Sequence, residues 1–158
     1  MALMTDQDLE QVVGELLSDM GTSRDVYEHL NNPNLVIKKW KNYSENCLGC
    51  SSTNWLEWQI WCNVKDTEYG KHFAKCHQIS QSGLYLVMER LDVCTLKDQQ
   101  QVDAIDWPVF LNDVLAFNFG RDKNGVIKCL DYSSTRDGYF LNLARKSTLL
   151  GNDPFNQN

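Results

Sequence analysis

The chain opens with a run of apolar residues at helical spacing. Across residues 5–20, leucine, valine and methionine recur every three or four positions, and Thr5 with Asp8 fits a capping box. This pattern predicts an opening helix. Two segments rich in β-branched and aromatic residues, 25–30 and 34–40, then flank an Asn-Asn-Pro turn, and together they predict a β-hairpin.

A second helix and a second hairpin follow. Ser52 or Thr53 can cap a helix that runs through 54–64, where three tryptophans supply a bulky apolar flank. We expect these tryptophans to pack in the core rather than to form a dimer or partner surface. Segments 72–80 and 84–91 have strand composition and are separated by a Gln-Ser-Gly turn, which predicts an antiparallel pair.

The last third of the chain reads as strands around a polar loop. Segment 107–120 is followed by a turn at 123–125 and by an apolar strand over 126–132. The final residues, 151–158, are polar and contain Pro and Gly, which is typical of a loose tail. We therefore expect one compact α+β domain over residues 1–150, with an antiparallel sheet and one main helix.

Composition and charge narrow the classes of function. The chain has 158 residues, of which 15 are Lys or Arg and 21 are Asp or Glu, so its formal net charge is −6. Without a basic stripe to neutralise phosphates or anionic lipids, binding to nucleic acid or to a membrane surface is not expected. No apolar run reaches the roughly 20 residues that span a bilayer, and the N-terminus lacks a secretion signal. We expect a cytoplasmic protein.

Six cysteines raise the question of disulfides and metal. Without a secretion signal, reduced thiols are the expectation. Cys47 and Cys50 form a CxxC pair that would supply half of a zinc site, with His72, Cys76 or His77 as further ligands. No second CxxC or HxxxH follows at the usual spacing, so the alternative for this Ser-, Asn- and Gly-containing segment is a surface loop.

The order and spacing of five polar residues resemble the protein kinase superfamily. Lys38 closes the sequence Leu-Val-Ile-Lys, and Glu57 follows 19 residues later in the tryptophan-rich helix, where the partner of a strand lysine is expected. A D-x-x-x-x-N motif, Asp113 to Asn118, comes before the apolar strand that leads to Asp131. The resemblance implies a kinase-like fold with an antiparallel N-terminal lobe, one main helix and a strongly reduced C-terminal lobe.

The resemblance also implies a role for each of these residues. Lys38 would hold the α and β phosphates of ATP, and Glu57 would orient that lysine. Asn118 and Asp131 would ligate Mg²⁺, a hard ion that prefers oxygen ligands. Asp113 would orient the acceptor hydroxyl and take its proton. ATP and Mg²⁺ are therefore the expected cofactors.

A further set of residues would form the nucleotide pocket if the resemblance holds. Gly21 opens a segment that is similar to the end of a glycine-rich loop, and Val26 would cover the adenine. Met88 would lie at the back of the pocket, while Glu89 and Leu91 would offer backbone groups to the base.

Departures from the family pattern bear on activity. Residues that differ from those usual in the family stand at seven positions: Asp19, Arg24, Leu111, Asn112, Leu115, Tyr132 and Ser133. Neutral Asn112 argues against control by activation-loop phosphorylation. Leu115 removes a positive charge from the γ-phosphate, and the short stretch after Asp131 leaves little room for a platform that binds a peptide.

Two functions follow from the resemblance. The first is a minimal bacteriophage- or effector-type kinase, dependent on ATP and Mg²⁺, that modifies Ser or Thr on a host or partner protein or on itself. The second is a pseudokinase that inhibits a partner protein by binding it. The net charge of −6 alone suggests a third function, an acidic decoy for a basic surface on a host protein.

Overall fold

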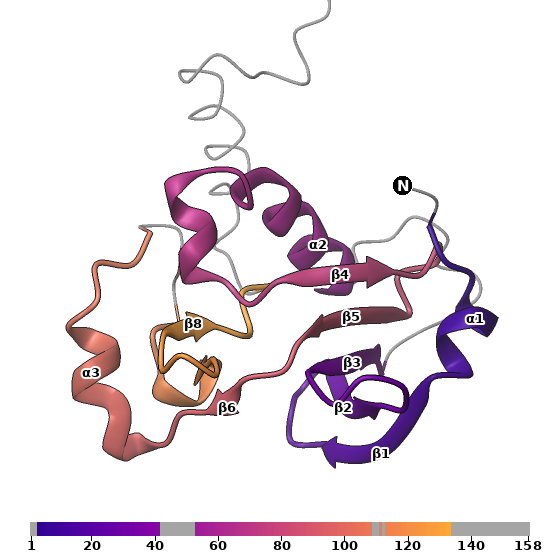
Figure 1. Ribbon diagram of the computed structural model, residues 1–158, viewed down its shortest axis with the longest axis horizontal. Helices are drawn as coiled ribbons and strands as arrows, with labels where there is room; N and C mark the ends of the chain where they lie inside the picture. The colour runs from indigo at the N-terminus through magenta and orange to yellow at the C-terminus, as the bar shows by residue number, and fades with distance from the viewer. Residues whose placement is uncertain (1–2, 42–52, 109–110, 112, 134–158) are drawn as a thin grey trace, which may run out of the picture.

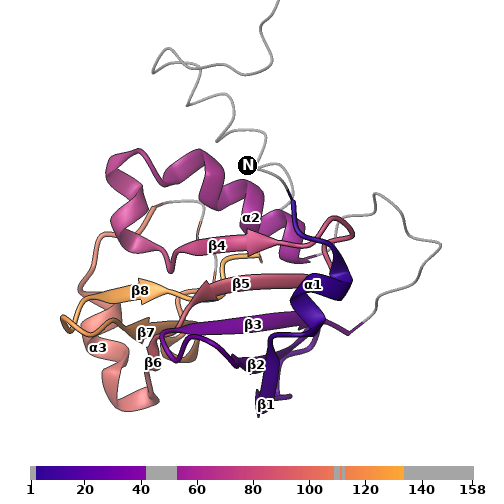
Figure 2. The ribbon, with the colours of Figure 1, turned by 45° about the vertical axis from the view of Figure 1, so that its right-hand side comes forward.

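The centre of the molecule is an antiparallel sheet of five strands in the order β1-β2-β3-β5-β4. The computed structural model describes residues 3–41, 53–108, 111 and 113–133. The strands are β1 (Val13–Ser18), β2 (Arg24–His29), β3 (Leu35–Trp40), β4 (Cys76–Ile79) and β5 (Tyr85–Glu89). Figure 2 shows them stacked side by side, with the longest described helix, α2 (Thr53–Val64), beside the β4 end.

A second, smaller sheet lies beside the first, in the order β6-β7-β8. Its strands are β6 (Asp92–Val93), β7 (Phe119–Arg121) and β8 (Ile127–Cys129). The short helices of the described chain are α1 (Asp6–Glu10), η1 (Glu68–His72), η2 (Leu96–Asp98), α3 (Gln99–Asp103) and η3 (Ala116–Asn118). In Figure 1 the second sheet and α3 form one side of the molecule, and α1 with β1 to β3 forms the other. The expected α+β class is confirmed.

Helix α2 forms because its buried positions follow helical spacing. Asn54, Glu57, Ile60 and Val64 are all buried, three or four residues apart, and they face β3, β5 and β4. The three tryptophans of the helix are half-buried and pack against the same core, as expected from the sequence. A helix that is apolar on most of its surface gains its stability from this packing rather than from its own propensity.

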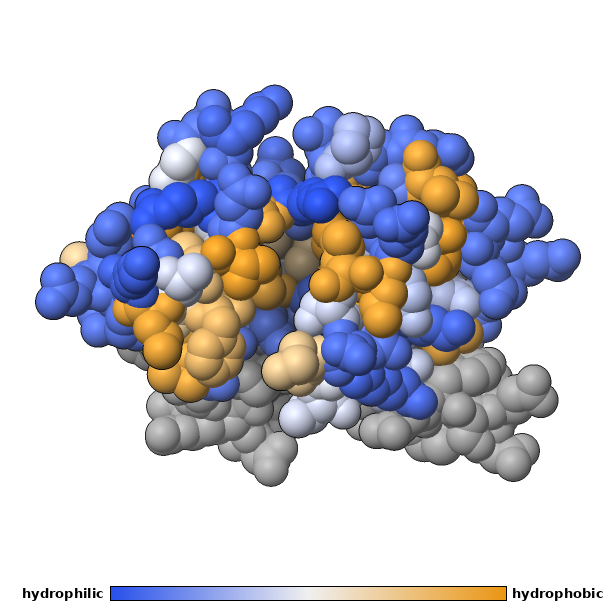
Figure 3. Space-filling view, turned by 90° about the horizontal axis from the view of Figure 1, so that it is seen from below, coloured by the Kyte–Doolittle hydropathy of each residue, from blue (hydrophilic) through white to orange (hydrophobic). Residues whose placement is uncertain are grey.

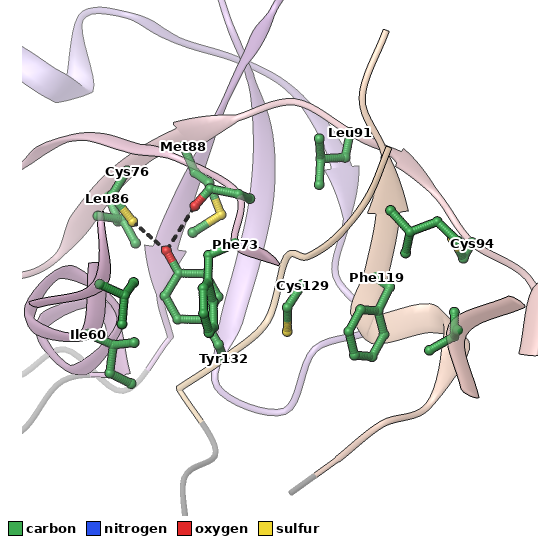
Figure 4. Close-up of a cluster of buried hydrophobic side chains, with 14 of the residues drawn as sticks. Ile60, Phe73, Cys76, Leu86, Met88, Leu91, Cys94, Phe119, Cys129 and Tyr132 are labelled. Atoms are coloured by element: carbon green, nitrogen blue, oxygen red, sulfur yellow. Dashed lines mark hydrogen bonds between the residues drawn. The ribbon is translucent and has the colours of Figure 1, made fainter. Parts of the chain in front are cut away.

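The main core joins α2 to both sheets. Figure 4 shows Phe73 and Tyr132 between Ile60 on α2 and Phe119 on β7. The rings of Phe73 and Tyr132 meet edge to face, with centroids 4.9 Å apart. The Tyr132 hydroxyl is also satisfied, because it donates to the carbonyl oxygen of Ala74 at 3.0 Å. The residue after Asp131 is therefore anchored deep in the core.

Both predicted hairpins and the predicted turn are confirmed. Strand β2 pairs with β3, and β4 pairs with β5, in antiparallel register. The turn between β7 and β8 has Gly125 at φ +80°, a conformation that glycine adopts without strain. These elements are specified locally, by their β-branched and aromatic composition and by turn formers.

The predicted opening helix over 5–20 is wrong beyond its first turns. The capping box of Thr5 and Asp8 is present, but α1 ends at Glu10 and the chain continues as β1. The reason is tertiary: β1 pairs with β2 and so satisfies the outer backbone groups of that strand. Leu16 and Leu17 remain largely exposed, which no amphipathic helix face would explain.

Some expectations lie outside the described residues. Cys47, Cys50, Asn112 and the segment 151–158 belong to this part of the chain. Within the described ranges, no helix combines the length and apolar character that crossing a membrane requires.

The packing of the core predicts that substituting two different leucines by alanine will have very different effects on stability. Leu86 on β5 is fully buried, whereas Leu96 is 75% exposed. We expect Leu86→Ala to lower the free energy of unfolding by about 2–5 kcal/mol, because it leaves a cavity against α2. The control, Leu96→Ala, should stay within about 0.5 kcal/mol of the unsubstituted chain in urea unfolding. Equal losses in the two variants would contradict this packing.

Candidate functional site

A buried carboxylate, that of Glu57, lies at the centre of the candidate site. Glu57 is 0% exposed and projects from α2 toward the sheet. The Arg24 guanidinium donates to both of its oxygens, at 2.5 and 3.0 Å, and the Lys38 ammonium does the same at 3.0 and 3.2 Å. The backbone N–H of Tyr132 donates to Glu57 Oε1 at 2.9 Å. Such a charge is tolerated in the interior only when it is paired in this way.

The register of β3 directs Lys38 toward α2. Lys38 lies opposite Val26 of β2 and opposite Leu86 of β5. Successive side chains of a strand point to opposite faces, so Lys38 and Lys39 diverge. Lys39 lies over the ring of Tyr85, 5.5 Å from its centroid, on the face that carries α1.

Asp131 joins this cluster from the far end of the described chain. Arg24 Nη2 donates to Asp131 Oδ1 at 2.7 Å, and the Ser133 hydroxyl donates to the same oxygen at 3.2 Å. Lys38 Nζ donates to the carbonyl oxygen of Leu130. Two cations and two anions, from segments up to 107 positions apart, therefore form one electrically neutral cluster.

The charges of the cluster shift the pKa values of Asp131 and Arg24. Burial alone raises the pKa of the Asp131 carboxyl, but the positive charges of Lys38 and Arg24 outweigh it, so the net shift is downward. Burial alone lowers the pKa of the Arg24 guanidinium, and the carboxylates of Glu57 and Asp131 turn this into a net rise. Both groups therefore remain ionised at neutral pH.

Asn54 fixes the first turn of α2 to the sheet. Its Nδ2 donates to the carbonyl oxygens of Lys38, Gly83 and Leu84 at 3.0–3.1 Å. Its Oδ1 accepts from Arg24 Nη1 at 3.4 Å. Sequence reasoning missed Asn54, although its position three residues before Glu57 puts both on one helix face.

Arg24 is the other functional residue that sequence reasoning missed in this role. It stands out only as a departure from a glycine pattern, yet it is 5% exposed and contacts two carboxylates. The sequence carried no local signal for this role, because Arg24 lies just before the predicted strand 25–30 and its carboxylate partners are 33 and 107 positions away.

The Asp113 to Asn118 loop lies against the Asp131 segment. Asn118 Nδ2 donates to the backbone oxygen of Asp113 at 3.1 Å. The backbone oxygen of Asn118 accepts from the N–H groups of Leu130 and Asp131 at 2.9 and 3.3 Å. Asn118 is nearly buried, whereas Asp113 is exposed. The loop is thus held in place while the Asp113 carboxylate faces solvent.

Gly21 and Val26 lie on the β2 side of the cluster. Gly21 belongs to the exposed turn between β1 and β2, and a Cβ there would come within 2.6 Å of the backbone oxygen of Arg24. Its own carbonyl oxygen accepts from Lys41 Nζ at 2.8 Å. Glycine is therefore needed where this turn leads into Arg24. Val26 is half-buried, next to Lys38 in the neighbouring strand.

The other predicted pocket residues lie at the junction of the two sheets. Met88 and Leu91 are buried in the main core. The backbone N–H of Glu89 donates to the oxygen of Lys75 at 2.8 Å, so it is already used within the protein. The Glu89 carboxylate pairs with Lys128 of β8 at 2.9 Å. This ion pair ties the end of β5 to the second sheet.

Exposed apolar side chains flank a hollow on one face. Figure 3 shows this face hollowed between the side of the molecule that carries α3 and the side formed by β1 to β3. Large apolar residues that are exposed on these two parts are Leu16, Leu17, Met20, Leu30, Val93, Leu96, Leu115, Phe117 and Val126.

Few of the described side chains near Asp131 could serve as ligands for a metal ion. In the part of the chain that the structure describes, no group of three or more His, Cys, Asp and Glu residues is arranged to hold a metal ion. Mg²⁺ bound together with phosphates needs only one or two carboxylates, which the oxygens of Asp131 and Asn118 fit by chemical type. However, Arg24 already pairs with Asp131, so the ligand-free arrangement does not fit a resident cation.

The structure describes three of the residues predicted as possible zinc ligands, and their surroundings differ. Cys76 is buried, and its Sγ lies 3.0 Å from the Tyr132 hydroxyl. Burial raises the pKa of the Cys76 thiol, which disfavours the thiolate that binds zinc. His77 is exposed, and His72 meets the ring of Trp107 edge to face at 5.3 Å.

Comparison with known proteins gives no assignment, so the functional argument rests on the geometry of the charged cluster around Glu57. No protein-family model matches the chain. No curated protein matches it in sequence. The structure brings Lys38, Glu57 and Asp131 into one cluster, with Asn118 beside it through the backbone of Asp131.

The pairing of Glu57 with Arg24 and Lys38 can be tested by its effect on the stability of the fold. Glu57→Gln leaves Arg24 and Lys38 buried with one fewer negative charge, so we expect a loss of about 3–5 kcal/mol in the free energy of unfolding. The matched control is Glu28→Gln, because Glu28 pairs with Arg90 at the surface. Its loss should stay below about 1 kcal/mol in the same urea titration. A small loss in Glu57→Gln would show that its pairing is not needed for folding.

Asp131 predicts a pH dependence. Because its folded pKa lies below the ordinary value of 3.8, its ionised form stabilises the fold above that value. This stabilisation is lost as pH falls through the lower, folded pKa. We expect the stability difference between the unsubstituted chain and Asp131→Asn to be constant near neutral pH and to shrink below about pH 4. Urea unfolding at several pH values measures it, and a difference that grows on acidification would contradict the pairing.

Proposed function

We propose that this chain is a minimal protein-kinase-like phosphotransferase that uses ATP and Mg²⁺ to modify Ser or Thr on a partner protein or on itself. The observation that carries the proposal is the Lys38–Glu57 ion pair, with the Asp131 segment bonded to the same lysine. The three residues come from β3, α2 and the segment after β8, so tertiary folding alone brings them together.

The chemistry of phosphoryl transfer fits this cluster. The reaction needs positioning and charge compensation more than covalent work by the protein. Lys38, oriented by Glu57, is the cation for the phosphates, and Asp131 with Asn118 offers oxygen ligands. When bound, Mg²⁺ would neutralise charge on those phosphates. The exposed Asp113 is free to meet an acceptor hydroxyl and to take its proton.

The arrangement of sheets supports the same proposal. In it, the five-stranded sheet with α2 is the N-terminal lobe, and the second sheet with η3 is a strongly reduced C-terminal lobe. The link over Glu89 to Leu91 joins the two parts and the base would lie against it, with the N–H groups of Glu89 and Arg90 bonded within the protein. The hollow in Figure 3 lies between the two parts. Such a reduced form is similar to kinases of bacteriophages and bacterial effectors, which favours a host or partner protein as substrate, in the cytoplasm.

A pair of neighbouring lysines tests the proposal. We expect Lys38→Met to lower transfer of label from γ-labelled ATP, in the presence of Mg²⁺, by about 100-fold or more, because it removes a cation from the phosphates. Lys39→Met is the control, since Lys39 points to the opposite face of β3 and should keep its activity. The acceptor is a general Ser- and Thr-containing protein, with the chain itself as a second acceptor. Absence of transfer by the unsubstituted chain to either acceptor, or equal activity in Lys38→Met, would contradict the proposal.

A second candidate function is a pseudokinase that binds and inhibits a partner protein. The observation that favours it is the complete use of the charged groups within the protein: Lys38 meets Glu57 and Leu130, and Arg24 meets Asp131. A phosphate would have to displace these contacts. ATP that raises the melting temperature without any transfer of label would favour this second function over the first.

A further inference from the structure

Arg24 holds a place in the cluster that the proposed function does not explain. It begins β2, lies opposite Trp40 in the register, and extends inward rather than to solvent. Its guanidinium bonds to Glu57 through both nitrogens and to Asp131 through Nη2. It also contacts Ser133 Oγ at 3.3 Å. An arginine with two carboxylate partners and almost no exposure is a buried cation that stays charged.

A guanidinium and a divalent cation are alternative partners for the same carboxylate. Arg24 Nη2 is 2.7 Å from Asp131 Oδ1, which is the distance of a charge-assisted hydrogen bond. A metal ion that binds this oxygen would have to take it from Arg24, and its positive charge would then meet the charges of Arg24 and Lys38 at close range. The Asp131 side chain is 43% exposed, so solvent and ions can reach it.

We propose that Arg24 is a built-in competitor of divalent metal at Asp131, so that the ligand-free chain binds such ions weakly. This inference rests on the proposed function for its role in the site: a polyphosphate would draw the guanidinium away, because Arg binds phosphate oxygens through two parallel hydrogen bonds. Asp131 would then be released. Metal binding would follow nucleotide binding and would not precede it.

Glu57 does not offer the metal an alternative. Its side chain is 0% exposed and has Lys38 and Tyr132 as further partners when Arg24 is removed. Any metal affinity gained on removal of Arg24 should therefore depend on Asp131. This dependence makes the proposal testable with a double-mutant cycle.

The experiment is a titration of the ligand-free chain with Mn²⁺, which takes the same oxygen ligands as Mg²⁺ and is detected by electron paramagnetic resonance. The variants are Arg24→Gln, Asp131→Asn and the double variant. We expect Arg24→Gln to bind Mn²⁺ about 10- to 100-fold more tightly than the unsubstituted chain, because a charge-assisted hydrogen bond no longer competes. The double variant should lose that gain. Arg90→Gln, which removes a surface ion pair with Glu28, is the control and should change nothing.

Two results would overturn the proposal: no gain in Arg24→Gln, or a gain that persists in the double variant. If Arg24→Gln does not fold, a comparison of Mn²⁺ affinity between the unsubstituted chain and Asp131→Asn still tests the proposal. Asp131→Asn alone should leave its weak Mn²⁺ affinity unchanged, and a clear drop would show that Asp131 already binds metal beside Arg24.

A failure of the proposed function can be distinguished from a failure of this inference. Thermal shift of the unsubstituted chain with ATP, with and without Mg²⁺, reports nucleotide binding. No shift in either condition, together with no label transfer, would remove the nucleotide role and leave the Mn²⁺ cycle as a measure of Arg24 alone. A shift with ATP, combined with tight Mn²⁺ binding in the absence of ATP, would support a nucleotide site and overturn the competition.

Discussion

The burial of one carboxylate constrains most of this structure. Glu57 is fully removed from water, and an unpaired carboxylate there would be far too costly to keep ionised. Its partners are Arg24, Lys38 and the Tyr132 N–H. Because these come from β2, β3 and the segment after β8, satisfying one side chain requires that three distant parts of the chain meet α2.

The contacts of Glu57 that stabilise the fold also occupy the cations that a phosphate ligand would need. A lysine and an arginine that hold a buried carboxylate are the only described cations bonded to Glu57, and a phosphate ligand would need at least one of them. Strong internal pairing stabilises the ligand-free fold and opposes ligand entry. Under the proposed function, the balance between these effects would separate an active phosphotransferase from a binding module with the same shape.

The second sheet positions the other half of the candidate site. Lys128 of β8 pairs with Glu89 at the end of β5 and with Asp122 in the β7–β8 turn, at 2.9 and 3.1 Å. Burial alone lowers the pKa of the Lys128 ammonium, but these two carboxylates reverse the shift and raise it. Together with the ring contact of Phe73 and Tyr132, this pairing holds the segment around Asp131 against the first sheet, where it meets Arg24 of β2 and Lys38 of β3.

Local patterns were enough to predict the two hairpins, helix α2 and the glycine turn before β8, because strand composition, helical spacing and turn chemistry act over a few neighbouring residues. The pairing of Lys38 with Glu57 was also foreseen, from a family resemblance. The path of residues 13–18 was not, since their apolar spacing fits a helix and only the free edge of β2 favours a strand. Nor were the roles of Arg24 and Asn54 foreseen. Each depends on partners at least 16 positions away, and neighbouring residues carry no information about such contacts until the chain has folded.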